Sequence, residues 1–184
     1  RNGKATAALD ELSRLLNLPK PPVFIESYDI SHTAGSDNVA GMVVFKNGLP
    51  YKKNYCRFSI KGFDGQDDYA SMAEVISRRL NRYMEEKDTE EGFGILPDLI
   101  LLDGGKGHVA AVKPLVRSMG YDVPIFGMAK DDRHRTRVIT TEDGELSVSS
   151  FKTAFDLLTS IQDEVHRFSI EYSRSKHQNK AMES

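Results

Sequence analysis

Cysteine is nearly missing from this sequence, since Cys56 is the only one in 184 residues. A single thiol excludes an internal disulfide and a zinc site built from several cysteines, and it suits the reducing cytosol. Long apolar runs are missing too: no stretch approaches the roughly 18 apolar residues of a transmembrane helix, and no signal peptide opens the chain. We therefore expect a cytoplasmic protein without membrane attachment.

An excess of positive charge is also lacking, because 25 Lys and Arg stand against 27 Asp and Glu, for a net charge of −2. A dedicated nucleic-acid-binding protein is often strongly basic, so the global charge gives no indication of nucleic acid. The composition itself is globular, with 39% hydrophobic and 28% charged residues, and no tract of low complexity interrupts it. A chain of 184 residues then fits one domain with a sizeable core.

Apolar periodicity and turn residues divide the chain into alternating helices and strands. Three prolines between residues 19 and 22 end the first helix and force an extended connection. Asn47-Gly48 is a strong signal for a tight hairpin turn, and Asp67 is the expected N-cap of the second helix. The expected order is helix 4–16, strands 23–31, 39–45 and 51–60, helix 68–86, strand 99–102, helix 107–118, strand 124–129, a hairpin over 137–148, and helix 153–172.

Taken whole, this order fits an α/β fold with a mixed five-stranded sheet, in which an antiparallel meander joins parallel βαβ units. That is the ribonuclease H-like arrangement, flanked by helices, here with an extra hairpin before the last helix. We expect a linker helix and proline-rich connection over 1–22, the ribonuclease H-like domain over 23–175, and a basic C-terminal tail over 176–184. The first and fourth strands lie side by side in this fold.

Three segments far apart in the chain each place a potential metal ligand at or near the end of a regular element. Asp29 and Asp103 follow apolar strand segments, and a buried carboxylate needs a cation or a hydrogen-bond network to offset its desolvation. His166 lies on the last helix beside inward-facing Val165. If the two acids converge with the histidine, the mixed oxygen and nitrogen ligands would suit Mn²⁺ and would tolerate Mg²⁺ less comfortably.

Each of these residues also has an ordinary structural explanation. Asp29 can be a turn aspartate, and Asp103 can be a turn acid at the end of a strand. A lone histidine on a helix is often structural. Gln162 and Asp163, one turn before His166, can orient its ring.

A fourth acid and a glycine-rich segment lie near these positions. Asp68 falls in the first turn of its helix, where a capping or dipole-pairing role is the simpler explanation. The segment from Gly104 to Gly107 follows a strand like a phosphate loop, but it fails the Walker pattern, because Ile100 occupies the first glycine position. We expect its glycines to clear space beside a metal or a nucleic-acid backbone, with Lys106 placed for a phosphate.

Basic residues gather after the fifth strand and along the last helix, where a surface that tracks phosphates would flank the site. A solvated face is the alternative explanation. Arg78, Arg79 and Arg82 are expected to be exposed helix charge. The candidate DNA-binding residues, with Lys106, are Lys130, Arg133, Arg135, Arg167 and Arg174.

Five segments of the chain resemble one known family, in order: IESYDISHTAGSDNVAGMVVFKNGLPYKKNYCRFSIKG, DDYASMAEVISRRL, LPDLILLDGGKGHVAAVKPL, GMAKDDRHRT and LLTSIQDEVHRFSIEYSRS. The family is the C-terminal endonuclease domain of UvrC, the incision subunit of bacterial nucleotide excision repair. The resemblance implies a ribonuclease H-like fold and a metal-dependent DNA endonuclease that makes the 5′ incision. The family's catalytic Asp-Asp-His set falls on Asp29, Asp103 and His166, and the second acid of its DDYA motif falls on Asp68.

The resemblance further implies a divalent cofactor, Mn²⁺ or Mg²⁺, and damaged double-stranded DNA as substrate. It implies UvrB, with the UvrA–UvrB damage-recognition system, as partners through the full-length protein. Two residues depart from the family pattern: Cys56 stands where arginine is usual, and His108 where glutamine usually follows GGKG. Neither removes an implied ligand. The alternative function is a non-catalytic DNA- or protein-docking module that retains the fold.

Overall fold

The computed structural model describes residues 2–32, 38–60, 67–130, 137–148 and 150–183, without the side chains of 2, 137 and 172–183. Within these residues one mixed sheet forms the centre of the molecule, in the order β3-β2-β1-β5-β6-β7-β8, with β4 also paired to β2. Its strands are β1 (Phe24–His32), β2 (Asn38–Lys46), β3 (Leu49–Pro50), β4 (Cys56–Ile60), β5 (Leu99–Asp103), β6 (Ile125–Lys130), β7 (Arg137–Thr141) and β8 (Gly144–Leu146).

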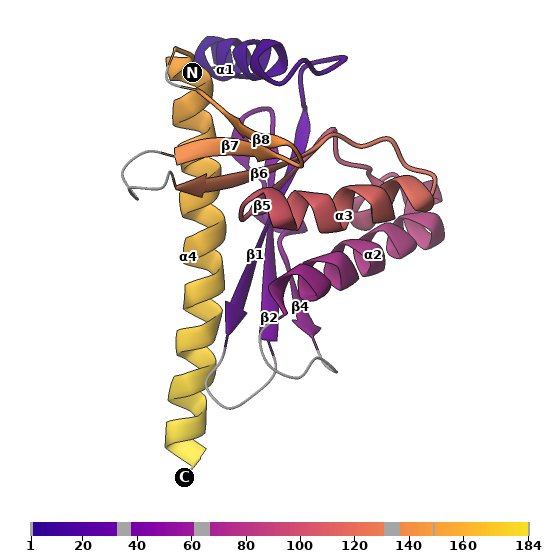
Figure 1. Ribbon diagram of the computed structural model, residues 1–184. Coiled ribbons are helices and arrows are strands. Elements are labelled where there is room, and N and C mark those ends of the chain that lie inside the picture. Colours follow the sequence, from indigo (N-terminus) through magenta and orange to yellow (C-terminus); the bar gives the residue numbers. More distant parts are fainter. Residues whose placement is uncertain (1, 33–37, 61–66, 131–136, 149, 184) are drawn as a thin grey trace.

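Helices cover both faces of the sheet, so that the protein has three layers (Figure 1). The helices are α1 (Asn2–Leu15), α2 (Asp68–Glu86), α3 (Lys106–Ser118) and α4 (Lys152–Glu183), with short 3₁₀ turns η1 (Lys52–Asn54), η2 (Lys87–Thr89) and η3 (Gly92–Gly94). One apolar core lies between the sheet and α2 and α3, and the other between the sheet and α1 and α4. No helix in the described part of the chain combines the length and apolar character that crossing a bilayer requires.

The pairing of β1 with β5 confirms the predicted ribonuclease H-like α/β arrangement. The two strands run parallel, from Ile25 opposite Leu99 to Tyr28 opposite Leu102, while β1 and β2 run antiparallel. The predicted hairpin becomes β7 and β8, which extend the sheet beyond β6. The ends of the first and fourth strands of the predicted five-stranded sheet are therefore neighbours, as the sequence indicated.

The predicted strand over 51–60 is wrong in its first half. The turn η1 lies there instead, the two-residue strand β3 precedes it, and β4 begins only at Cys56. Tyr51 N still donates to Val44 O at 2.7 Å, but Tyr55 N donates to Lys52 O at 3.1 Å, which closes the turn and interrupts the pairing with β2. Both pieces pair with β2, so the broken strand still forms one edge of the sheet.

The two ends of the chain are helical. In α1, Ala8, Leu9 and Leu12 are buried in the same core as α4, so residues expected to form a linker helix pack against the domain. At the other end, α4 runs from Lys152 to Glu183, past the predicted end at residue 172 and through the region expected to be a basic tail. It is the long helix that extends beyond the strands in Figure 1.

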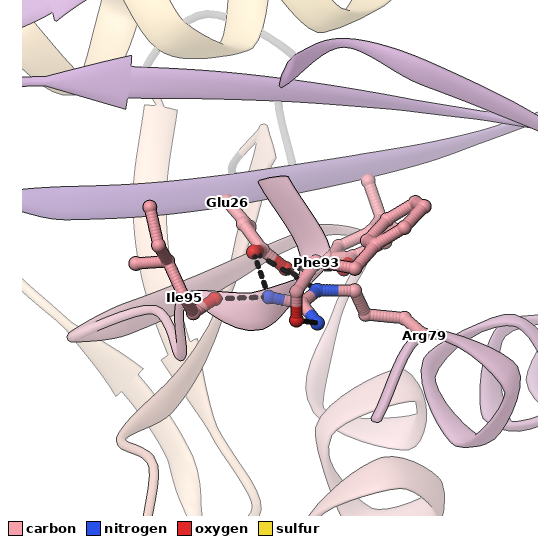
Figure 2. Close-up of polar contacts among 5 residues, drawn as sticks. Glu26, Arg79, Phe93 and Ile95 are labelled. Atoms are coloured by element: carbon pink, nitrogen blue, oxygen red, sulfur yellow. Dashed lines mark hydrogen bonds and ion pairs between the residues drawn. The ribbon is translucent and has the colours of Figure 1, made fainter. Parts of the chain in front are cut away.

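Arg79 on α2 forms a buried ion pair with Glu26 on β1 (Figure 2). Its Nη2 lies 2.8 Å from Glu26 Oε2, and its Nη1 donates to Phe93 O at 2.9 Å, while Ile95 O accepts a further bond. Tyr28 Oη donates to the same carboxylate at 2.6 Å. The expectation that Arg79 is exposed is therefore wrong, since its side chain is fully buried. Burial is possible because η3 and β1 together supply acceptors for the guanidinium.

Breaking this pair should strongly destabilise the fold. Arg79→Met would leave the Glu26 carboxylate buried without its cation, which costs about 3–5 kcal/mol of unfolding free energy. Urea denaturation measures the loss. Arg82→Ala is the matched control, because Arg82 forms an exposed pair with Glu86 one turn away, and its removal should change stability by no more than about 1 kcal/mol. Equal losses in the two variants would contradict the prediction.

Candidate metal centre

Asp29, Asp103 and His166 come together at one end of the β1–β5 pair. One potential ligand atom from each residue lies within 4.8 Å of the others. Tyr28 is paired with Leu102, so Asp29 and Asp103 are the next residues of two neighbouring strands, and both face α4. Asp29 is buried, Asp103 is half-buried and the side chain of His166 is 63% exposed. The group therefore opens to solvent on the side of the histidine.

Gly41 on β2 determines how closely α4 approaches the sheet. Gly41 is the register partner of Asp29, and a Cβ atom there would lie 2.6 Å from Ser169 Oγ and 3.1 Å from the Phe168 ring. The helix thus rests against the backbone of β2 at this point. Since Ser169 follows His166 by three residues, this contact sets the height of the histidine over Asp29. Sequence reasoning missed Gly41, although an isolated glycine inside a strand signals a close approach.

The carboxylate of Asp29 has a raised affinity for a proton. Burial, followed by the negative charge of Asp103, raises the pKa of Asp29 to about 8. His166 Nδ1 lies 3.3 Å from Asp29 Oδ2, so the imidazole faces the same carboxylate. Two carboxylate oxygens and one imidazole nitrogen in a partly buried place match the ligand types that bind Mn²⁺. Mg²⁺ can bind there too, although it prefers nitrogen ligands less. The residues fit a divalent cation.

Gln162 on α4 contacts Asp103 and not the histidine. Its Nε2 donates to Asp103 Oδ1 at 3.1 Å, so the amide does not orient the ring of His166 as the sequence suggested. Asp163, the other residue considered for that role, is exposed.

Asp68 lies outside the three-residue group found among the described residues. Its Oδ1 is 3.0 Å from Nε2 of His32, whose Nδ1 lies 2.9 Å from Asn38 Oδ1. The acid therefore links the start of α2 to the end of β1. The predicted N-cap is confirmed at Asp67, whose side chain accepts from Ala70 N at 3.0 Å.

The candidate DNA-binding residues differ in their surroundings. Lys106, at the start of α3, and Lys130, at the end of β6, are exposed near the ends of the central strands. Arg167 is engaged on its own helix, with its Nε 2.8 Å from Glu164 Oε1 and its Nη1 2.6 Å from Glu171 Oε2. Its charge is therefore already balanced. Arg133, Arg135 and the side chain of Arg174 lie outside the described residues.

The metal-free protein should lose stability as the pH rises. The folded-state pKa of Asp29 lies near 8, above the ordinary carboxyl value of 3.8 that applies to the unfolded chain. Proton binding therefore stabilises the fold fully below pH 3.8, and this contribution is lost as the pH rises through about 8. In EDTA, Tm should fall across this window for the parent chain and vary less for Asp29→Asn. Mn²⁺ should raise the parent's Tm most at the alkaline end, and identical pH profiles of the two proteins would refute the prediction.

Enlarging Gly41 should separate α4 from the sheet. Gly41→Ala is expected to cost about 1–3 kcal/mol of unfolding free energy and to weaken Mn²⁺ binding, because His166 moves with the helix. Urea denaturation and titration calorimetry measure the two effects. Gly105→Ala is the control, since a Cβ there meets no atom within 4 Å. Adding Ser169→Ala to Gly41→Ala removes the closest contact and should restore part of both losses; no restoration would show that the contact does not set the helix position.

Residues 13–170 match the family model of the UvrC RNase H endonuclease domain. The chain is 46% identical over 182 residues to UvrABC system protein C of Acetivibrio thermocellus, covering 92% of this chain and 29% of that protein. It is 45% identical over 190 residues to UvrABC system protein C of Alkaliphilus oremlandii, covering 98% and 31%. The chain thus spans less than a third of the length of these curated relatives.

Among solved structures, the chain is similar to Endonuclease V of Ciona intestinalis in complex with a 23mer DNA containing an inosine. The TM-score is 0.45 at 19% identity, covering 71% of this chain and 56% of that one. Human Endonuclease V gives a TM-score of 0.43 at 13% identity, covering 71% and 60%. The match over residues 13–170 and the identity to the two relatives establish that the chain belongs to the UvrC RNase H endonuclease domain family.

Proposed function

We propose that this chain is a metal-dependent endonuclease domain that hydrolyses a phosphodiester bond of DNA and makes the 5′ incision in nucleotide excision repair. The observation that carries the proposal is the convergence of Asp29, Asp103 and His166, from three separate elements, within 4.8 Å. Membership of the UvrC endonuclease family supports the reaction class. The names of the relatives, UvrABC system protein C, support a role of the longer protein in the UvrABC system. Damaged double-stranded DNA as substrate and UvrB as a partner are parts of this proposal that the family resemblance implies.

The position of each side chain indicates whether it would bind the metal or the phosphate. Asp29 and Asp103 would hold Mn²⁺ or Mg²⁺ through oxygen, with His166 as a nitrogen ligand on the open side. When bound, a divalent cation supplies Lewis-acid polarisation of the scissile phosphate and a more acidic water. Lys106, exposed three residues after Asp103, would contribute positive charge to the phosphate oxygens. The catalytic role of Asp68 stays a hypothesis, since the acid contacts His32.

A docking module that keeps this fold without the reaction is the second candidate. Such a module has no use for two carboxylates that face each other in a partly buried place, because their repulsion only lowers stability. An apolar or hydrogen-bonding pair at the ends of β1 and β5 would serve docking better. The paired acids therefore favour the nuclease.

The test is nicking of supercoiled plasmid by this chain with Mn²⁺, Mg²⁺ or EDTA. The parent should nick in the presence of metal, while Asp29→Asn and Asp103→Asn should lose more than about 100-fold in rate, because each removes a ligand charge. Retained metal-dependent nicking by either variant would overturn the site assignment. Lys106→Ala should slow nicking. Lys113→Ala is its control, because Lys113 lies two turns further along α3 and is paired with Glu142 between β7 and β8.

Mn²⁺ titration separates the two functions if the parent does not nick. Binding that depends on Asp103 would indicate a competent centre with too little DNA affinity. Absence of such binding would favour the docking module. His166→Ala should also weaken Mn²⁺ binding, and an unchanged affinity would show that His166 is not a ligand.

A further inference from the structure

We infer that Gln162 is a positioning residue of the metal centre, whose amide holds one carboxylate oxygen of Asp103 so that the other is directed to the cation. The inference rests on the proposed function, because it assigns Gln162 a role toward the metal that Asp29, Asp103 and His166 would bind. It adds a residue that neither touches the cation nor reacts.

The geometry places Gln162 directly over Asp103. Its Nε2 lies 3.1 Å from Asp103 Oδ1 and 3.5 Å from Met128 O. Gln162 precedes His166 by four residues, so consecutive turns of one face of α4 supply the support and the third ligand. The helix that brings the histidine to Asp29 therefore also fixes Asp103.

The sheet determines which end of the amide faces Asp103. Asp103 and Met128 are register partners across β5 and β6, so their oxygens lie side by side beneath α4. An amide nitrogen carries two hydrogens and can serve two acceptors, whereas the reversed amide would place its oxygen against both. The nitrogen end is therefore the one that fits.

The other end of the amide makes no hydrogen bond to the described residues. Gln162 Oε1 is buried and has no hydrogen-bond partner among the described residues, which is unfavourable for folding. The small cavity beside the side chain is largely apolar, with Met128, Ile139 and Leu158 among its lining residues. An apolar side chain of the same length would suit this environment better. The amide acts through its nitrogen, whose shorter bond is the one to Asp103.

A neutral donor also suits the charge requirement of the site. The carboxylate of Asp103 faces that of Asp29, and repulsion favours its rotation away unless a donor holds it. A lysine or arginine would hold it too, but its charge would cancel part of the attraction for a divalent cation. The amide fixes the carboxylate and leaves both negative charges for the metal.

The test replaces Gln162 by methionine, which keeps the unbranched chain and removes the amide. Gln162→Met should raise the Kd for Mn²⁺ by about 10–100-fold, as loss of a support to a metal ligand typically does. Its Tm in EDTA should stay the same or rise, because an unsatisfied buried oxygen is removed. Nicking should recover at saturating Mn²⁺, since the ligands themselves are intact.

Leu158→Ala is the matched control for packing, since Leu158 lines the same cavity one turn earlier. It should lower Tm in EDTA and leave the Kd for Mn²⁺ unchanged. Parent-like Mn²⁺ affinity in Gln162→Met would overturn the inference. It would also be overturned if Gln162→Met and Leu158→Ala lowered both the Tm in EDTA and the affinity for Mn²⁺ to the same extent. If the parent itself fails to bind Mn²⁺, the proposed function fails and the inference with it. If the parent binds through Asp103 while Gln162→Met matches it, only the inference fails.

Discussion

Repulsion between the carboxylates of Asp29 and Asp103 is the constraint around which this domain is organised. Parallel pairing of β1 with β5 forces the two acids to the same edge of the sheet and the same face. Burial and this repulsion together raise the pKa of Asp29 to about 8, which favours a bound proton or cation at this carboxylate. The helix α4 completes the arrangement by bringing His166 to Asp29 and Gln162 to Asp103. Without that helix the acids would face solvent, where they would have little reason to select a metal.

Strand β1 carries two buried acids, and one of them, Glu26, is neutralised by an arginine of the protein. Glu26 and Asp29 are three residues apart, so they face opposite layers of the structure. Glu26 forms an ion pair with the guanidinium of Arg79 (Figure 2). It also accepts a hydrogen bond from the hydroxyl of Tyr28. Within the described residues, Asp29 has no lysine or arginine partner and faces an imidazole that is largely exposed. The cation for Asp29 is therefore expected to come from solution, and this contrast is the physical argument for a metal centre over a structural ion pair.

The sequence predicted the parts of the site that depend on strand order and missed those that depend on how helices sit on the sheet. Asp29 in β1 and Asp103 at the end of β5 each come after an apolar segment, and the order of elements alone makes those strands neighbours. The partner of Gln162 could not be predicted, because it depends on the rotation of α4 about its axis. Arg79 was assigned to the surface for the same reason: one residue of rotation on α2 separates it from exposed Arg78. The break between β3 and β4 could not be predicted from Pro50, because the next residue, Tyr51, still donates to Val44 O and the turn η1 comes after it.

The ligands also bear on how many cations the centre can hold. Sites with two metals hold them about 3.5–4 Å apart and need further carboxylates to bridge or cap them. In the described part of the chain no fourth acid joins the group of three. Asp68 is the acid that the family resemblance offers, and it already lies 3.0 Å from His32, which in turn contacts Asn38 on β2. A second cation would have to draw Asp68 away from that histidine and loosen the link between β1 and α2. If the centre binds metal as proposed, the His32–Asp68 pair is the contact that any second cation must displace.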